Sequence, residues 1–259
     1  MPTHQTHTLI LPARNGWRWI AEGNRIYTKS RMTLALMVVC YWMLMLTVSN
    51  LVPAVGGLVT TICFPALSVG LMDVCRRIDR GEAVVTQTLF SGFSTNLRVL
   101  LSLGAIYIVI VLAIFGVTAL FDGGRLFRVF FMGESLQTTA PNPLATWAAL
   151  LLLLPVVMAY WYAPVLAAWH GHSAGKSLFF SLFACLRNWR AFFVYALSLF
   201  FLAVIFALFS GSISAIVPGT GRLVVMLLLT GFFALPVVYA SFYVSYCDVF
   251  AVGGGSEDA

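Results

Sequence analysis

The stretch GHSAGKSLFFSLFACLRNWR, residues 171–190, contains a Gly-Lys-Ser that could belong to a phosphate-binding loop. In such a loop four residues separate the first glycine from the Gly-Lys pair, a strand comes before and a helix after, and backbone amides surround the phosphates. Here only three residues lie between Gly171 and Gly175, and the apolar run MAYWYAPVLAAWH precedes them. No βαβ unit is predicted that could supply a magnesium-binding acid. The sequence therefore does not predict a nucleotide-binding site.

Two histidines, His170 and His172, lie in the motif WHGH and could bind a metal ion together with His4 and His7 near the amino terminus. A metal site needs three or four ligands in a fixed geometry, with further hydrogen bonds that orient them. No acidic residue lies near His170 and His172 in sequence, and His4 and His7 belong to a terminal segment that is expected to be mobile. Because histidines at a helix end more often hydrogen-bond water or headgroups, we predict no metal site and no cofactor.

The acidic residues do not suggest acid–base catalysis. Asp73, followed one turn later by Arg76 and Arg77, and Asp248 lie at the ends of apolar runs, where each acid can pair with an arginine. The chain has no nucleophile elbow, no HExxH motif and no paired aspartate inside an apolar run. We therefore predict that the protein is not an enzyme.

The composition is that of a protein embedded in a lipid bilayer. Hydrophobic residues make up 61% of the 259 residues and charged residues only 9%, whereas soluble domains have roughly 45–50% apolar and 25% charged residues. The mean hydropathy is +0.95. In such a chain the formal net charge of +6 is a signal of membrane topology, and no nucleic-acid partner is predicted.

Six apolar runs approach or exceed the roughly 20 residues that a helix needs to cross a bilayer. They cover approximately residues 32–51, 57–75, 98–121, 145–169, 191–217 and 222–247. Of the 15 lysines and arginines, all but Arg125, Arg128 and Arg222 flank these runs on one side. By the positive-inside rule that side is cytoplasmic. We predict a multi-pass protein of the bacterial inner membrane with both termini in the cytoplasm.

The even-numbered runs share a central proline. These prolines are Pro65, Pro164 and Pro236, with a second one, Pro155, in the fourth run. An interior proline removes a backbone hydrogen bond and tends to kink its helix. We predict that Pro65, Pro164 and Pro236 are structural kinks at equivalent places and face the interior of a helical bundle.

A polar or amphipathic segment precedes each odd-numbered run. Each segment is expected to end in an asparagine and an arginine, namely Asn24 with Arg25, Asn96 with Arg98, and Asn188 with Arg190. A helix with Phe and Leu on one face and Lys or Arg on the other lies in the headgroup plane. The predicted fold is therefore an all-α integral membrane protein. Its six transmembrane helices form three hairpins, each preceded by a cytoplasmic interfacial amphipathic helix.

Basic and aromatic residues at the cytoplasmic ends of the runs are the candidate lipid-binding residues. Arginine can hold a phosphate through two hydrogen bonds, tryptophan favours headgroup depth, and each basic residue attracts anionic lipids by about 1 kcal/mol. The candidates are Arg76, Arg77, Lys176, Arg187, Trp189 and Arg190. Membrane lipids are thus the predicted partners, and no protein partner is specified. For the last three residues, anchoring of the fifth run alone is the alternative.

The chain reads as a single transmembrane domain, residues 1–252, followed by the flexible acidic tail GGGSEDA, residues 253–259. The stretches YWYAPVLAAWHGHSAGKSLFFSLFACLRNWRAFFVYAL, GLMDVCRRIDRGE and LFSGF resemble an uncharacterised family of multi-span inner-membrane proteins, proteobacterial in type and of unknown function. This resemblance covers about residues 12–252 and implies no catalytic or ligand residues. The architecture is more loosely similar to membrane domains attached to some lipid-processing enzymes.

Two hypotheses of function follow. The first is a non-enzymatic membrane protein that acts through lipid or protein contacts of its cytoplasmic interfacial helices. The alternative is a small transporter or channel for a neutral or lipidic substrate, because broken helices often surround binding sites near the midplane. The apolar runs carry no charge at mid-span, which argues against a charged substrate.

Overall fold

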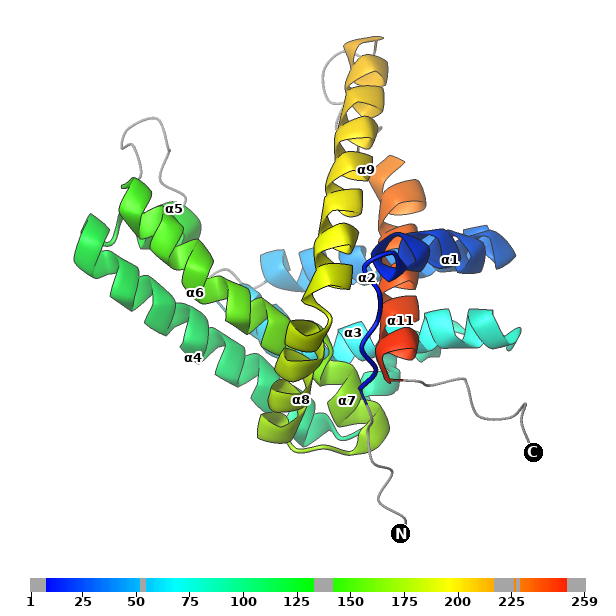
Figure 1. Ribbon diagram of the computed structural model, residues 1–259, viewed down its shortest axis with the longest axis horizontal. Coiled ribbons are helices and arrows are strands. Elements are labelled where there is room, and N and C mark those ends of the chain that lie inside the picture. Colours follow the sequence, from blue (N-terminus) through cyan, green and yellow to red (C-terminus); the bar gives the residue numbers. More distant parts are fainter. Residues whose placement is uncertain (1–7, 52–54, 133–141, 217–225, 227–228, 251–259) are drawn as a thin grey trace.

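The computed structural model describes residues 8–51, 55–132, 142–216, 226 and 229–250, and within these ranges every regular element is helical (Figure 1). The elements are α1 (Asn15–Lys29), α2 (Arg31–Leu51), α3 (Gly56–Arg80), η1 (Thr86–Phe93), α4 (Leu97–Asp122), α5 (Arg125–Met132), α6 (Pro143–Trp161), α7 (Ala163–His170), α8 (Ala174–Arg187), α9 (Trp189–Ile216), η2 (Thr230–Ala234) and α11 (Leu235–Phe250). The prediction of an all-α protein is confirmed. The predicted flexible tail, residues 253–259, lies outside the described residues.

In the described part of the chain, six helical segments are long and apolar enough to cross a membrane. The fourth combines α6 and α7 as Pro143–His170, and the sixth combines η2 and α11 as Thr230–Phe250. The other four are α2, α3, α4 and the part of α9 from Trp189 to Phe209. These segments overlap the six predicted runs, so the prediction of six membrane-length helices is confirmed.

The long helices form arms that diverge from a common region (Figure 1). In the first arm α2 packs along α3, and the hydroxyl of Ser49 lies 3.1 Å from that of Thr60. In the second arm α4 packs along α6, and the side chain of Asn142 donates a 2.8 Å hydrogen bond to the carbonyl of Phe121. The third arm is α9, which packs mainly on α1 and has only 6% of its membrane-length segment buried. The connection from α9 towards η2, residues 217–225, lies outside the described residues.

The three predicted kink prolines are all buried, but they sit in different local structures. Pro65 lies inside the continuous helix α3. Pro164 lies at the start of α7, directly after the helix has been interrupted at Tyr162. Pro236 follows the π-helical segment η2. In α3 most buried residues follow the proline, so Pro65 marks where the exposed half of the helix gives way to the buried half. Pro236 is the second residue of α11, and the buried residues of α11 follow it.

The short elements pack in a cyclic order that joins the arms. Element η1, which precedes the second arm, packs on α3 of the first arm, and α8, which precedes α9, packs on α6 and α7 of the second arm. Helix α1, at the start of the chain, packs on α11 and α9 at its end. Thus η1 and α8 each pack on the arm that precedes them in the chain. Because α1 packs on the last helices of the chain, the contacts of the three short elements form a closed cycle.

Two local features differ from the sequence-based prediction. Asn24 and Arg25 do not end the first short element, because α1 continues to Lys29 with Ile26 and Tyr27 buried. The second short element is a 3₁₀-helix instead of an amphipathic α-helix. Its sequence TQTLFSGF combines threonines and a glycine, which favour an α-helix weakly.

Glycines allow the short elements to pack closely against the long helices. A β-carbon at Gly23 of α1 would lie 2.5 Å from the backbone nitrogen of Ser241 in α11. A β-carbon at Gly70 of α3 would lie within 2.9 Å of the backbone of Leu89 in η1. Small residues of this kind allow helix backbones to approach closely in membrane proteins, where hydrophobic burial between helices supplies little stabilisation.

We predict that Gly23→Ala destabilises the protein by about 1–3 kcal/mol, because the added methyl group meets the backbone of α11 and must separate the two helices. Thermal unfolding in detergent measures the change. Gly175→Ala is the matched control, because it lies in α8 with open space at its β-carbon. That control is expected to be neutral or stabilising by up to about 1 kcal/mol. An unchanged melting temperature for Gly23→Ala would contradict the close contact of α1 with α11.

Candidate functional site

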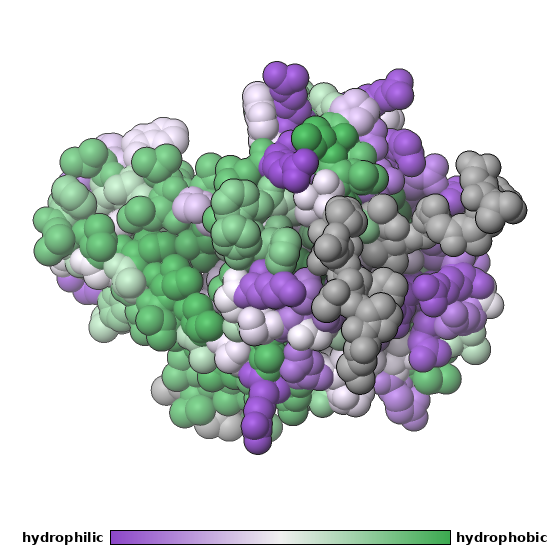
Figure 2. All heavy atoms as spheres, turned by 60° about the horizontal axis from the view of Figure 1, so that its bottom comes forward, coloured by the Kyte–Doolittle hydropathy of each residue, from purple (hydrophilic) through white to green (hydrophobic). Residues whose placement is uncertain are grey.

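Buried polar side chains gather where the arms meet. We call this region the base: it consists of α1, η1, α7 and α8, packed on α11 and on the part of α3 that follows Pro65. Trp19 of α1 and Tyr246 of α11 are among its largest fully buried side chains, and Tyr162 is fully buried just before α7. In Figure 2 hydrophilic side chains gather over the base, whereas the arm of α4 and α6 on the left is mostly hydrophobic. The base is therefore the part of the molecule suited to polar recognition.

Asp248, near the end of α11, receives the first helix of the chain. Its Oδ2 accepts a 2.9 Å hydrogen bond from the side-chain amide of Asn15 and another of 2.9 Å from the indole of Trp19. Its Oδ1 lies 3.5 Å from the guanidinium of Arg18. The expectation that Asp248 pairs with an arginine is confirmed. Because Asn15 and Trp19 are buried, the carboxylate also satisfies two donors that would otherwise be buried without a partner.

Side chains of the base satisfy backbone groups at two of the prolines. At Pro164 the hydroxyl of Ser181 in α8 accepts from the backbone N–H of Tyr162 at 2.9 Å and donates to the carbonyl of Met158 at 2.8 Å. The serine therefore stands in for a helical hydrogen bond. Pro236 cannot donate to the carbonyl of Phe232 four residues earlier, and that carbonyl accepts a 2.8 Å hydrogen bond from the hydroxyl of Tyr27 in α1.

Asn188, between α8 and α9, holds the segment that leads into α1. Its side-chain oxygen accepts from the backbone N–H of Leu11 at 2.8 Å, and its amide donates to the carbonyls of Leu9 and Ala184. The backbone N–H of Leu9 also donates to the carbonyl of Val249 at 3.0 Å. The side chain of Asn188 is only 1% exposed, so it joins the two segments inside the protein and is not a surface residue.

Arg76 is held in place by neighbours from two helices. One guanidinium nitrogen lies 2.6 Å from Oδ1 of Asp73, and the guanidinium stacks on the indole of Trp169 at 4.4 Å from the ring centroid. The other oxygen of Asp73 accepts a hydrogen bond from Ser91 of η1 at 2.5 Å. The expected pairing of Asp73 with an arginine is confirmed. Arg76 therefore joins α3 to α7, and about a third of its side chain stays exposed.

The two histidines of the WHGH motif have different surroundings. The Nε2 of His170 lies 2.7 Å from the hydroxyl of Tyr246 in α11. His172 is buried, and its ring lies 5.5 Å from the ring of Phe180 and 5.7 Å from that of His170. Burial, together with Lys176 and His170 nearby, lowers the pKa of His172 below its usual value of 6.5. No group of three or more His, Cys, Asp or Glu residues that could hold a metal ion occurs within the described ranges.

The remaining predicted lipid-binding residues are on the surface of the base. Lys176 is exposed, with its ammonium group 5.7 Å from the ring centroid of Phe180, and Arg77 is half-buried with a hydrogen bond to the carbonyl of Ala83. Arg187, Trp189 and Arg190 are exposed at the foot of α9. Lipid binding by all six residues stays a prediction.

The Gly-Lys-Ser stretch has none of the geometry of a phosphate loop. Gly171 ends α7 with a φ of +64°, which suits the last position of a helix. Lys176 and Ser177 lie inside α8, and the hydroxyl of Ser177 is buried. The backbone amide of Ser177 is used within the helix, because it donates to the carbonyl of Ser173.

Two hollows adjoin the base. One, of about 640 Å³, has a mixed polar and apolar lining at the ends of α1 and α3, which includes the ion pair of Lys29 with Asp79 at 2.6 Å. The other, of about 180 Å³, is lined by apolar side chains of α2, α3 and η1 and by Thr60.

The thiol of Cys185 points to the carbonyl of Met158, and burial raises its pKa to about 12. It is therefore a neutral thiol at physiological pH and a weak nucleophile.

The sequence is related to a bacterial membrane protein. A probable inner membrane protein of Burkholderia thailandensis is 32% identical over 251 residues, which cover 93% of this chain and 92% of the relative. The chain belongs to the family of that protein. No protein-family model matches the chain, and no solved structure matches it. With its six apolar helices, the chain is an integral membrane protein, and the predicted resemblance to multi-span inner-membrane proteins is confirmed.

Sequence reasoning did not find the residues that join the base. Asn15, Trp19, Ser181 and Tyr27 make contacts to partners that are 19 to 233 positions away. A pattern read along one helix cannot reveal such a partner. Asn188 is the one residue of this kind that lies in a segment singled out from the sequence. Its neighbours Arg187 and Arg190 suggested a position at the surface, whereas its side chain is buried.

We predict that the protein loses stability as the pH falls below about 6.5, in part through His172. The folded state holds the pKa of His172 below that of the unfolded chain, so the unfolded chain binds the proton more readily. Its contribution is fully present above the unfolded pKa and declines as the pH falls towards the folded pKa. Melting temperatures at pH 8 and pH 5.5 should differ less in His172→Gln than in the wild type. An equal difference in both would contradict the assignment to His172.

Proposed function

We propose that this chain is a non-enzymatic, multi-pass protein of the bacterial inner membrane whose cytoplasmic base binds anionic lipids. In this proposal residues 1–252 form one domain with both termini in the cytoplasm. The pairs α2 with α3, α4 with α6 and α7, and α9 with η2 and α11 are the three proposed membrane hairpins, and the short elements α1, η1 and α8 lie at the cytoplasmic membrane surface. The name of the Burkholderia relative supports the inner membrane as the location.

The closed ring of contacts in the base carries this proposal. Hydrogen bonds of buried polar groups join its elements, as at Asp248 and Ser181, and its exposed charged residues are mostly basic. The exposed basic residues of the base include Arg14, Arg18, Arg25, Arg80, Lys176, Arg187 and Arg190. A firmly joined core with a basic surface suits attachment to a negatively charged membrane surface better than it suits chemistry on a substrate.

The transporter or channel alternative gains no support from the hollows. The larger one lies beside the ends of α1 and α3, at the edge of the base, and the smaller one has an almost wholly apolar lining. A neutral or lipidic substrate would need a path between the arms, and neither hollow provides one. Lipid contact therefore remains the function that the geometry supports best.

The orientation can be tested by labelling single cysteines in a cysteine-free background with an impermeant maleimide. We expect cysteines at Glu82 and Lys176 to be labelled only after the inner membrane is opened. A cysteine at Arg125, at the start of α5, should be labelled in intact spheroplasts. These three positions are exposed. The opposite pattern would invert the proposed topology.

The lipid function can be tested on the wild-type protein by native mass spectrometry. We expect phosphatidylglycerol to stay bound at least several-fold more than phosphatidylcholine after exchange into mixed micelles of equal composition, because the base carries a surplus of basic side chains. The preference should weaken as the salt concentration rises, since exposed charges are screened. Equal retention of both lipids at low salt would rule out the proposed function.

A further inference from the structure

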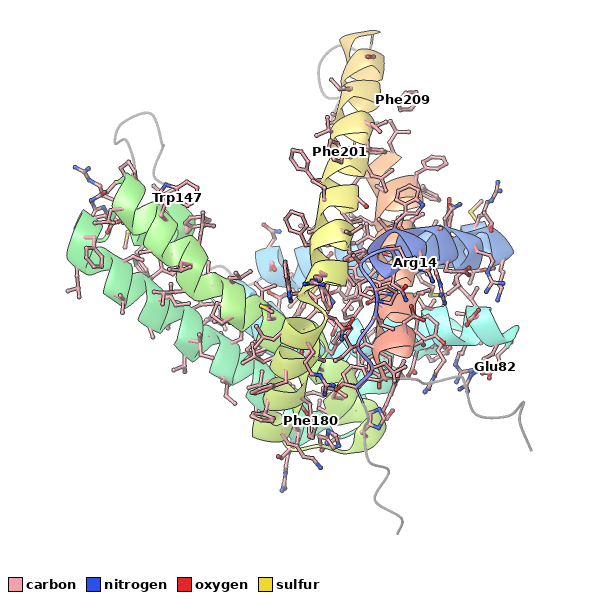
Figure 3. The ribbon with its side chains drawn as sticks, in the orientation of Figure 1. Arg14, Glu82, Trp147, Phe180, Phe201 and Phe209 are labelled. Atoms are coloured by element: carbon pink, nitrogen blue, oxygen red, sulfur yellow. The ribbon has the colours of Figure 1, made fainter. Side chains whose placement is uncertain are left out.

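The larger hollow, of about 640 Å³, lies at the ends of two membrane-length helices. Its lining comes from the end of α1 and the start of α2 on one side, and from the end of α3 and the residues that follow it on the other. Figure 3 shows Glu82 just past the end of α3, on the side of the molecule where α1 also ends. Because α2 begins at Arg31 and α3 ends at Arg80, the hollow lies at headgroup depth in the proposed topology.

The charges that line this hollow are balanced. Among the described residues they are two bases and two acids, Lys29, Asp79, Arg80 and Glu82. The ammonium group of Lys29 lies 2.6 Å from Oδ1 of Asp79 and 2.9 Å from its backbone carbonyl, so this pair is closely bound. A nitrogen of Arg80 lies 3.9 Å from a carboxylate oxygen of Glu82, which is beyond hydrogen-bond distance. This second pair therefore presents a guanidinium and a carboxylate side by side, each with hydrogen-bonding capacity for a ligand.

The backbone fixes the position of Glu82. Gly81 ends α3 with a φ of +72°, and its N–H donates to the carbonyl of Ile78 at 3.2 Å. The N–H of Glu82 donates to the carbonyl of Arg77 at 2.8 Å. Together these two hydrogen bonds form the Schellman motif, which turns the chain back over the end of a helix. The acid is thus attached to an ordered helix end and not to a loose loop.

Neutral groups complete the lining. The hydroxyl of Ser30 donates to the hydroxyl of Thr33 at 2.8 Å, so the hydrogen of Thr33 can be given to an acceptor on a ligand. Ile78, Ala83 and Val84 supply apolar surface. The volume of the hollow is within the roughly 300–1,000 Å³ that is usual for small-molecule sites. A ligand with one anionic group, one cationic group and some hydrocarbon therefore matches every part of the lining.

We propose that this hollow binds the headgroup of phosphatidylethanolamine, a phospholipid that carries a phosphate and a primary ammonium group. The guanidinium of Arg80 binds the phosphate, and the carboxylate of Glu82 accepts hydrogen bonds from the ammonium group. Ala83 and Val84 contact the glycerol part. The site goes beyond the proposed function, which concerns anionic lipids on the basic surface of the base.

The balance of charge favours this lipid over other phospholipids. An anionic lipid would bring its phosphate close to Asp79 and Glu82 without a cation for either acid, and like charges repel. The ammonium group of phosphatidylcholine is fully methylated, so it has no N–H to donate to a carboxylate. Soluble phosphoethanolamine carries the same two charged groups, but it lacks the glycerol and acyl chains that suit a hollow beside two membrane-length helices.

The test is a native mass spectrometry titration of the detergent-solubilised full chain. We expect phosphatidylethanolamine to bind the wild type roughly five- to tenfold more tightly than phosphatidylcholine, because only the former donates hydrogen bonds to the acid. The hollow variant combines Arg80→Gln with Glu82→Gln, and the matched control combines Glu22→Gln with Arg25→Gln. Glu22 and Arg25 form an ion pair at 2.7 Å on α1 and do not line the hollow. Both variants keep the net charge of the wild type.

The preference for phosphatidylethanolamine should fall below about twofold in the hollow variant and stay unchanged in the control. Retained preference in the hollow variant, or equal loss in both variants, would overturn the site. Equal binding of the two lipids by the wild type would also overturn it, and this comparison is independent of how well any variant folds.

Two further measurements separate this site from its alternatives. Soluble phosphoethanolamine should displace the lipid only weakly, because it lacks the hydrocarbon part. Tighter binding of the soluble compound than of the lipid would overturn the lipid as the occupant. Wild-type protein without a preference for phosphatidylglycerol over phosphatidylcholine would overturn the proposed function alone, because that preference depends on the basic surface and not on the hollow.

Discussion

The packing of α1 on α11 is the contact on which the base depends, because it joins the first helix of the chain to the last. A hydrogen-bonded carboxylate, Asp248, fixes one end of this contact, and the close approach of Gly23 to Ser241 fixes its middle. At the far end the hydroxyl of Tyr27 binds a carbonyl that Pro236 cannot use. Without these three attachments the cyclic order of short elements would be open, and the third arm would lose its main neighbour.

Buried residues are concentrated in the base because, in lipid, packing of apolar helices against one another stabilises the protein little. Apolar side chains on α9 lose no water when they touch another helix instead of lipid, so packing there must come from close backbone contact or from polar groups. The base supplies both through its glycines and its buried hydrogen bonds, whereas the outer part of α9 has a surface of Phe, Leu and Ile and stays uncovered. The divergent arms in Figure 1 follow from this difference.

The fold could be predicted from the sequence as far as local patterns reach. Apolar length predicted the six membrane helices, and the local sequence predicted that Asp73 pairs with a nearby arginine, which is Arg76. For Asp248 the sequence predicted an arginine partner but not that this partner is Arg18 of α1. The exchange of short elements between arms could not be predicted, because nothing in α1 indicates that its partner lies 230 residues later. For the same reason the close approach of Gly16 in α1 to Ala191 in α9 could not be predicted.

The prolines connect the sequence pattern to this cyclic packing. A proline leaves a carbonyl without its helical donor, and inside a membrane protein another group must supply one. Tyr27 of α1 does so at Pro236, whereas Ser181 of α8, near Pro164, bridges the backbone N–H of Tyr162 and the carbonyl of Met158. In α3 the segment after Pro65 meets the backbone of Gly92 in η1 instead. Each proline thus lies where a short element from another part of the chain docks, which explains why the prolines recur at similar places although η1, α1 and α8 differ in length and conformation.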